Sequence, residues 1–144
     1  MNTTNPYKNS VGYSDPTVYS ALKQIQREEF RKNPSYRPLV YICSPFAGDI
    51  ARNIANTRRY CVFAVRQGTI PIAPHLLFPQ FLNDSDPDER NLGLLFGKIL
   101  LDRCEAVWAF GSRISKGMAA ELERAKHRGI PIMHYDTDCK EVTL

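Results

Sequence analysis

The sequence predicts an α/β fold in which a parallel β-sheet is flanked by helices. Short apolar runs occupy 38–44, 69–74, 105–111 and 130–135 of the 144-residue chain, and the first of them is rich in β-branched residues. Stretches long enough to form helices separate these runs. Strands that are buried on both faces of a parallel sheet are apolar throughout, whereas half-exposed strands alternate polar and apolar residues. The alternation therefore predicts a Rossmann-like (flavodoxin-like) parallel sheet.

The N-terminal segment is expected to add a helix outside this sheet. Residues 14–34 offer Ser14 or Asp15 as the N-cap and Pro16 at the first helical position, and Pro34 closes the segment. Residues before this helix are polar and resemble a loosely held arm. We therefore divide the chain into an N-terminal arm and helix at 1–37 and a single α/β domain at 38–144.

The helices of the α/β domain follow from apolar periodicity. The segment 49–68 places apolar side chains on one side and has Gly68 as its predicted C-cap, and the next connection, 75–88, has room for a helical turn. The segment 89–104 is apolar on more than one side, which is typical of a helix that is deeply buried or shared with a partner subunit. A further helix runs from Lys116 to its C-cap at Gly129.

The composition indicates a small-molecule protein of the cytoplasm. The net charge of +4 comes without a dense Lys/Arg block, which argues against a nucleic-acid surface. No apolar run approaches the ~20 residues of a membrane helix, and the N-terminus lacks the regions of a signal peptide. The cysteines show no CxxC spacing, so we expect free thiols in a reducing compartment, no metal site and no cofactor.

Ligands of parallel α/β sheets bind beyond the carboxyl ends of the strands. After the first strand, Ser44, Gly48 and Asp49 could meet a polar ligand, or Asp49 could simply cap the next helix. After the second strand, His75 could act as an acid or base near neutral pH, or cap the loop. The apolar residues that follow His75 could cover a flat ring or belong to the core.

The end of the third strand carries the most polar loop. Small, hydroxyl and cationic residues there could bind phosphate together with the helix N-terminus, although they would equally suit a solvated helix entry; these are Gly111, Ser112, Arg113, Ser115 and Gly117. The loop is not a Walker motif, because the GxxxxGK[ST] order is absent.

Glu121 breaks the pattern of the helix that follows. Met118, Leu122 and Ala125 form its apolar stripe, and Glu121 lies on the same face. A carboxylate that points to the strand ends could act as a nucleophile on a sugar carbon. Alternatively, Glu121 could interact with the helix dipole or form an ion pair with Arg113.

Four segments together resemble the nucleoside 2-deoxyribosyltransferase-like superfamily, in particular its small bacterial and phage members of unassigned function. They are "VYICSPFAGD", "IPIAPHLLFPQFL", "CEAVWAFG" and "SKGMAAELERAKHRGIPI", which span about 39 to 135. The superfamily's G-x-x-x-E-[LI] motif matches Gly117 to Leu122, which includes Met118, and implies that Glu121 attacks the anomeric carbon of a nucleoside or nucleotide. Hydrolysis by water or transfer to a second base would follow.

The resemblance also bears on the substrate. The transferases carry an aspartate for the 5′-hydroxyl six residues before the glutamate, and related nucleotide hydrolases carry a serine for a 5′-phosphate. This chain has Ser115 there, which together with Arg113 favours a nucleoside 5′-monophosphate. The "SPF" loop corresponds to the loop near sugar and base, which brings in Ser44, Phe46 and Asp49.

One family residue is missing. The helix before the third strand should carry an aspartate that assists proton transfer to the leaving base, yet Phe96, Gly97 or Lys98 occupies the position. His75, Asp84 or Asp86 could supply the acid; otherwise the protein is a nucleotide sensor that binds without turnover. A phosphoribohydrolase of the lysine-decarboxylase-like kind ranks last, because its PGGxGTxxE motif is absent. The resemblance further implies a homodimer or higher oligomer, for which helix 89–104 is the expected interface.

Overall fold

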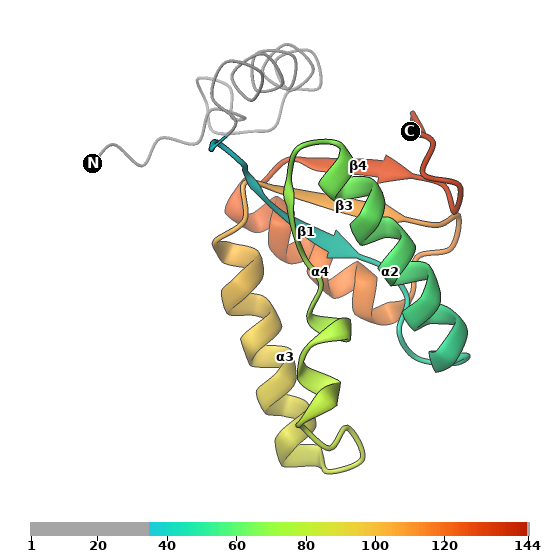
Figure 1. Ribbon diagram of the computed structural model, residues 1–144. Helices are drawn as coiled ribbons and strands as arrows, with labels where there is room; N and C mark the ends of the chain where they lie inside the picture. Colours follow the sequence, from blue (N-terminus) through green and yellow to red (C-terminus); the bar gives the residue numbers. More distant parts are fainter. Residues whose placement is uncertain (1–34, 144) are drawn as a thin grey trace.

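A four-stranded parallel sheet lies at the centre of residues 35–143, the part of the chain that this computed structural model describes (Figure 1). Its strands are β1 (Leu39–Cys43), β2 (Ile70–Ile72), β3 (Ala106–Phe110) and β4 (Ile132–Tyr135), in the order β2-β1-β3-β4. β1 pairs in parallel with both β2 and β3, and β3 pairs in parallel with β4. The predicted helix at 14–34 lies outside the described residues.

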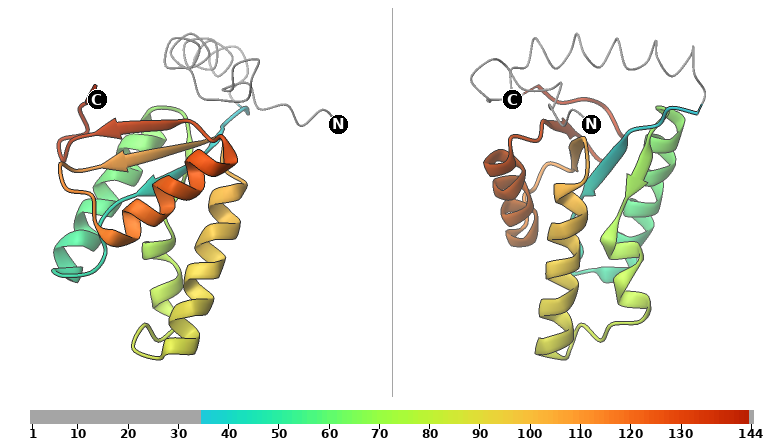
Figure 2. Two further views of the ribbon diagram at one scale, coloured as in Figure 1. Left: turned by 180° about the vertical axis from the view of Figure 1, so that it is seen from behind. Right: turned by 90° about the vertical axis from the view of Figure 1, so that its left-hand side faces the viewer.

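Helices cover both faces of this sheet (Figure 2). Helix α2 (Ile50–Arg66) packs on one face, and helices α3 (Pro87–Asp102) and α4 (Lys116–Arg128) pack on the other. The α2 side buries an aromatic cluster that includes Tyr60, Trp108 and Phe110, whereas the α4 side buries Tyr41, Cys43 and the apolar stripe of α4. The predicted fold class, a Rossmann-like parallel sheet between helices, is confirmed.

Element boundaries differ from the predictions at a few ends. Helix α2 ends with Gln67 as its C-cap, and Gly68 follows in the left-handed region at φ 84°. Helix α3 begins two residues early because Asp86 caps it and Pro87 takes the first position, where a missing N–H costs nothing. The predicted strand at 69–74 pairs over only three residues, and the connection after it forms short 3₁₀ turns at Pro74–Leu76 and Phe78–Gln80.

The strand order places a switch point between β1 and β3. From β1 the chain crosses through α2 to β2 on one side, and from β3 it crosses through α4 to β4 on the other. The loops that leave the two strands therefore diverge, and their space is where ligands bind in such sheets. Within residues 35–143 no helix has the length and apolar character needed to cross a membrane.

Candidate active site

The loop after β1 is held rigidly against α2. Asn53 donates from its side-chain amide to the carbonyls of Phe46 and Ala47, each at 3.0 Å. Asp49 caps α2 by accepting from the Arg52 N–H at 3.2 Å, so the capping interpretation of Asp49 is confirmed. These contacts fix the position of the Phe46 backbone at the switch point.

The Ser44 side chain faces the core rather than the ligand side. Only 1% of Ser44 is exposed, and its Oγ lies 2.9 Å from Oγ1 of Thr57. The Thr57 hydroxyl in turn donates to the Asn53 carbonyl at 2.8 Å. The Ser44 hydroxyl thus bonds to α2, and a contact between Ser44 and substrate stays a prediction.

His75 joins the end of β2 to the loop after β1. Its ring stacks on Phe46 with centroids 4.8 Å apart and planes 14° apart, and it donates a hydrogen bond to the Ser44 carbonyl. Burial lowers the pKa of His75, an effect that this hydrogen bond and the charge of Asp84 oppose. A neutral imidazole is suited to accept a proton rather than to donate one, so His75 is a poor candidate for the missing acid.

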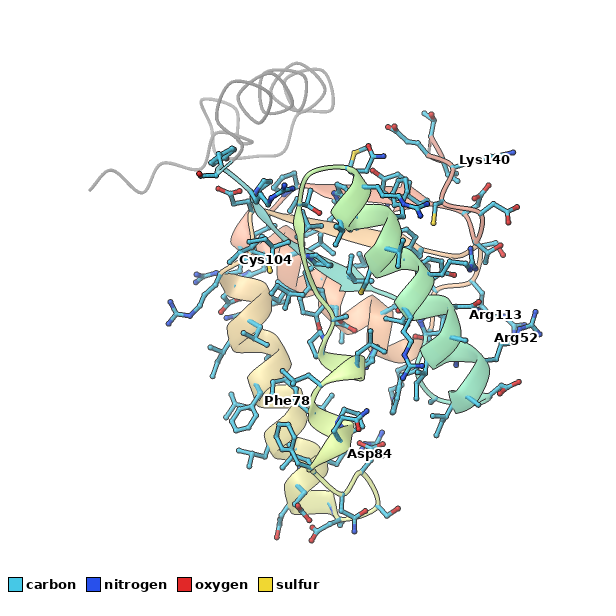
Figure 3. All side chains as sticks on the ribbon, in the orientation of Figure 1. Arg52, Phe78, Asp84, Cys104, Arg113 and Lys140 are labelled. Carbon is cyan, nitrogen blue, oxygen red and sulfur yellow. The ribbon has the colours of Figure 1, made fainter. Side chains whose placement is uncertain are left out.

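The loop between β3 and α4 combines a tight turn with exposed polar groups. Gly111 adopts φ 101°, a conformation that side chains other than glycine rarely tolerate, and the chain turns there directly after β3. Ser115 caps α4 by accepting from the Met118 N–H at 3.2 Å. Ser112, Arg113 and Gly117 are exposed, and Arg113 projects from the molecule, as Arg52 does (Figure 3).

Met118 is a core residue. Its side chain is 1% exposed and packs beside Cys43 and Leu122 in the core on the α4 side. Its carbonyl accepts a long contact of 3.9 Å from the Cys43 thiol, and its N–H is used by the Ser115 cap. The apolar stripe of α4 is thus confirmed, and a contact between Met118 and substrate stays a prediction.

Glu121 lies on the sheet-facing side of α4 with its carboxyl group buried. The Tyr41 hydroxyl, from the middle of β1, donates a hydrogen bond to this group, while the Glu121 Oε2 atom has no hydrogen-bond partner. Burial raises the pKa of Glu121 to about 7, and the Tyr41 hydrogen bond acts in the opposite direction. A carboxyl group with this pKa changes its charge near neutral pH, which is a property of functional carboxylates.

Sequence reasoning missed Tyr41. The residue pairs with Val107 across the sheet and is 3% exposed, so its apolar ring fits the core that the strand pattern predicts. A signal was present, because a buried tyrosine needs a partner for its hydroxyl. Tyr41 and Cys43 share one face of β1, and this face is the one that looks toward Glu121.

On α3, the structure separates the candidates for the missing aspartate. Phe96 packs on Phe78 with centroids 5.3 Å apart, and Lys98 is exposed. Gly97 is buried, and a Cβ built on it would lie 3.6 Å from the Tyr41 hydroxyl oxygen. Gly97 is therefore the α3 position that faces the Tyr41–Glu121 pair.

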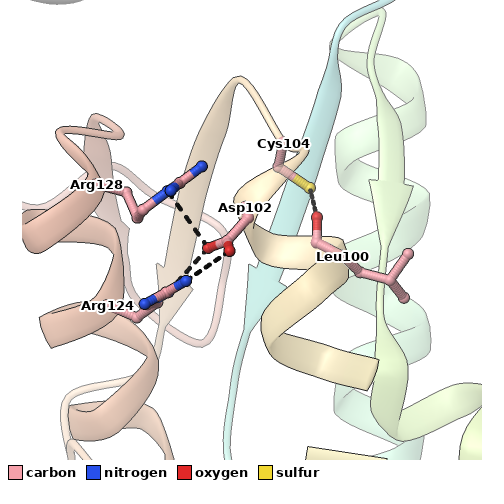
Figure 4. Close-up of polar contacts among 5 residues, drawn as sticks. All are labelled: Leu100, Asp102, Cys104, Arg124 and Arg128. Atoms are coloured by element: carbon pink, nitrogen blue, oxygen red, sulfur yellow. Dashed lines mark hydrogen bonds and ion pairs between the residues drawn. The ribbon is translucent and has the colours of Figure 1, made fainter. Parts of the chain in front are cut away.

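The remaining acidic candidates serve other contacts. Asp86 caps α3, and Asp84 is exposed on the connection before it. Asp102 accepts hydrogen bonds from Arg124 through both of its carboxylate oxygens, at 2.9 and 2.6 Å. The Nε atom of Arg128 lies 3.7 Å from Oδ1 of Asp102, so both arginines pair with this carboxylate (Figure 4). Among the residues described, no cluster of three or more His, Cys, Asp or Glu side chains could hold a metal ion.

Known proteins resemble this chain in family and in fold. A family model described as "Domain of unknown function (DUF7768)" matches residues 38–135. No curated protein matches the sequence. A solved 2-deoxyribosyltransferase from Bacillus psychrosaccharolyticus superimposes with a TM-score of 0.59 at 15% identity, covering 68% of this chain and 72% of that one.

A second similar structure is a 2-desoxiribosyltransferase from Leishmania mexicana. It superimposes with a TM-score of 0.50 at 17% identity, covering 69% of this chain and 64% of that one. Identities this low establish the fold alone. The chain therefore has the Rossmann-like fold that these two deoxyribosyltransferases have.

Proposed function

We propose that this chain, which belongs to the DUF7768 family, cleaves the N-glycosidic bond of a nucleoside 5′-monophosphate or nucleoside, with Glu121 as nucleophile. The carrying observation is a buried carboxyl group on the sheet-facing side of α4, which accepts from the Tyr41 hydroxyl and whose Oε2 atom has no hydrogen-bond partner. Attack of Oε2 on C1′ would form a glycosyl ester and release the base. Water would then regenerate the carboxylate by hydrolysis, or a second base would do so by transfer.

The loop between β3 and α4 is proposed to bind the 5′-phosphate. Ser112, Arg113 and Gly117 are exposed beside the N-terminus of α4, where unpaired N–H groups and the helix dipole favour an anion. Ser115 stands at the cap position and carries no charge that would repel a phosphate. The stacked Phe46 and His75 rings are proposed to line the sugar and base.

The direct test is release of free base. We expect the protein to liberate base from at least one member of a panel of ribo- and deoxyribonucleoside monophosphates, measured by chromatography. Glu121→Ala should abolish release, and Glu123→Ala, an exposed residue of the same helix, should leave it unchanged. Release that persists in Glu121→Ala would refute the role of Glu121.

A nucleotide sensor on the same fold is the second candidate. It is favoured by Gly97, which leaves no acid on α3 beside Tyr41. In a sensor, Glu121→Gln should leave ligand-induced thermal stabilisation nearly unchanged, and no nucleotide should be turned over. In an enzyme the same variant should bind substrate and lose turnover.

We also propose that the protein forms a homodimer through α3. Apolar side chains remain exposed along this helix although Leu101 is buried; they are Leu92 (41%), Leu94 (60%), Leu95 (50%) and Ile99 (44%). Deep burial within one subunit is thus excluded as the reason for its apolar character. Leu92, Leu95 and Ile99 have the i, i+3, i+7 spacing of one helix face, and an exposed apolar face of this kind is typical of a subunit interface.

A further inference from the structure

Glu121 has no cationic partner within the described part of the chain. The ion pairs there join Asp102 to Arg124 and Arg128, and Arg113 is exposed rather than paired with Glu121. Burial penalises the ionised carboxylate, and a buried charge becomes favourable only when an opposite charge or hydrogen bonds compensate it. A ligand that brings a positive charge to Oε2 would supply the missing compensation.

The groups around Glu121 are also poor proton donors. Burial raises the pKa of Tyr41 and of the Cys43 thiol, so both keep their protons at neutral pH. His75 has a lowered pKa and already donates its N–H to Ser44. Gly97 brings no side chain to the pair, since a Cβ built on it would lie 3.6 Å from the Tyr41 hydroxyl oxygen.

Within residues 35–143 no group beside Glu121 is therefore placed to protonate the leaving group. A purine or pyrimidine leaves as an anion unless it is protonated, and general acid catalysis contributes about 10²–10⁴-fold to such steps. A base that is attached through a positively charged ring nitrogen needs no proton, because it leaves as a neutral molecule. The same positive charge lies next to C1′, where the carboxylate must approach.

We propose that the substrate is an N-ribosyl pyridinium 5′-phosphate, an inference that rests on the proposed glycosidic chemistry. Glu121 Oε2 forms a bond to C1′ while the C1′–N bond breaks and its electron pair neutralises the pyridinium ring. Water then attacks C1′, the ester bond to Glu121 breaks, and the proton of the water passes to solvent. The products are a neutral pyridine, ribose 5-phosphate and one proton, so charge and atoms balance.

Substrate comparison tests this inference on the protein as it is. We would measure kcat/KM for nicotinamide mononucleotide beside adenosine, cytidine and 2′-deoxyadenosine 5′-monophosphates, with Glu121→Gln as the inactive control. The kcat/KM for the pyridinium nucleotide should be higher by about 100-fold or more, because the other nucleotides need general acid catalysis, which contributes at least that factor. Its rate should rise with pH up to about 7, the pKa of Glu121, and then stay level, since no acid is required.

Installing an acid should change the preference in the opposite direction. Gly97→Asp places a carboxyl group beside Tyr41, and its Cβ would lie 3.6 Å from the Tyr41 hydroxyl oxygen, an ordinary van der Waals distance. Gly97→Asn has the same shape without an acid and is the matched control. We expect Gly97→Asp to raise turnover of the ordinary nucleotides by about tenfold or more and Gly97→Asn to leave it unchanged. Circular dichroism would verify that both variants are folded.

The possible results of these assays separate the substrate proposal from the proposed glycosidic function. Cleavage of ordinary nucleotides with a bell-shaped pH profile, and none of the pyridinium nucleotide, would overturn the inference and leave the proposed function standing. If no substrate releases its base, both fail as catalysis. Binding measurements test the charge argument separately. The wild-type protein should bind the pyridinium nucleotide more tightly than its uncharged dihydropyridine form, and Glu121→Ala should abolish this difference. A difference that is undiminished in Glu121→Ala would overturn the charge argument.

Discussion

Replacing Glu121 by glutamine should stabilise the protein, and only at neutral to alkaline pH. Burial holds the pKa of Glu121 at about 7 in the folded protein, against 4.5 for an exposed glutamate. The folded state therefore binds the proton more tightly than the unfolded chain. The stability that this proton contributes is complete below pH 4.5 and is lost as the pH rises toward 7.

The magnitude follows from the two pKa values. At about 1.36 kcal/mol for each tenfold difference in proton affinity, the ionised carboxylate costs the folded state about 3 kcal/mol above pH 7. Glutamine has nearly the shape of the protonated acid and can still accept from Tyr41. We therefore expect Glu121→Gln to raise the free energy of unfolding by about 3 kcal/mol at pH 8 and to change it little at pH 4.

Urea denaturation at both pH values, followed by the fluorescence of Trp108, measures this difference. Other titrating groups contribute equally to both proteins, so they cancel in the comparison. Glu123→Gln, on an exposed position of the same helix, is the matched control and should show no such pH dependence. Equal effects of Glu121→Gln at pH 4 and pH 8 would refute the reasoning, because they would place the carboxyl group in contact with water.

Three further predictions concern the site and the assembly. Tyr41→Phe removes the hydrogen bond that favours the carboxylate, so the ascending limb of the pH–rate profile should move above pH 7 and turnover at pH 7 should fall about 5- to 10-fold. Ser115→Asp keeps a good N-cap for α4 but adds a negative charge that repels a phosphate. The kcat/KM should therefore fall about tenfold or more for a 5′-monophosphate and stay unchanged for the free nucleoside. Equal losses for the two substrates would contradict a phosphate at Ser115. Sedimentation velocity at micromolar concentration should show a dimer that Leu95→Asp dissociates, and a monomeric wild type would contradict the α3 interface.

The sequence was sufficient for the elements between residues 38 and 135 and for the place of Glu121 on the apolar face of its helix. Apolar runs and helical periodicity are local properties, and a carboxylate on an apolar stripe is visible without a structure. Strand order was not predictable in the same way, because the partners of β1 are set by contacts between distant parts of the chain. The inward direction of the Ser44 side chain and the use of the Met118 N–H in a helix cap were not predictable either, because a position near a strand end does not say which way its side chain or N–H points.

The Tyr41–Glu121 pair explains why a carboxylate is tolerated on the buried face of α4. Burial alone would favour the neutral acid, and an exposed carboxylate would be ionised but strongly hydrated. The Tyr41 hydroxyl offsets part of the burial penalty, so the group remains ionisable near neutral pH, and its Oε2 atom has no hydrogen-bond partner. Such an oxygen stabilises the folded protein in no evident way. Packing does not require a carboxylate there, since glutamine or leucine would serve packing equally well, whereas the proposed attack on C1′ does require one.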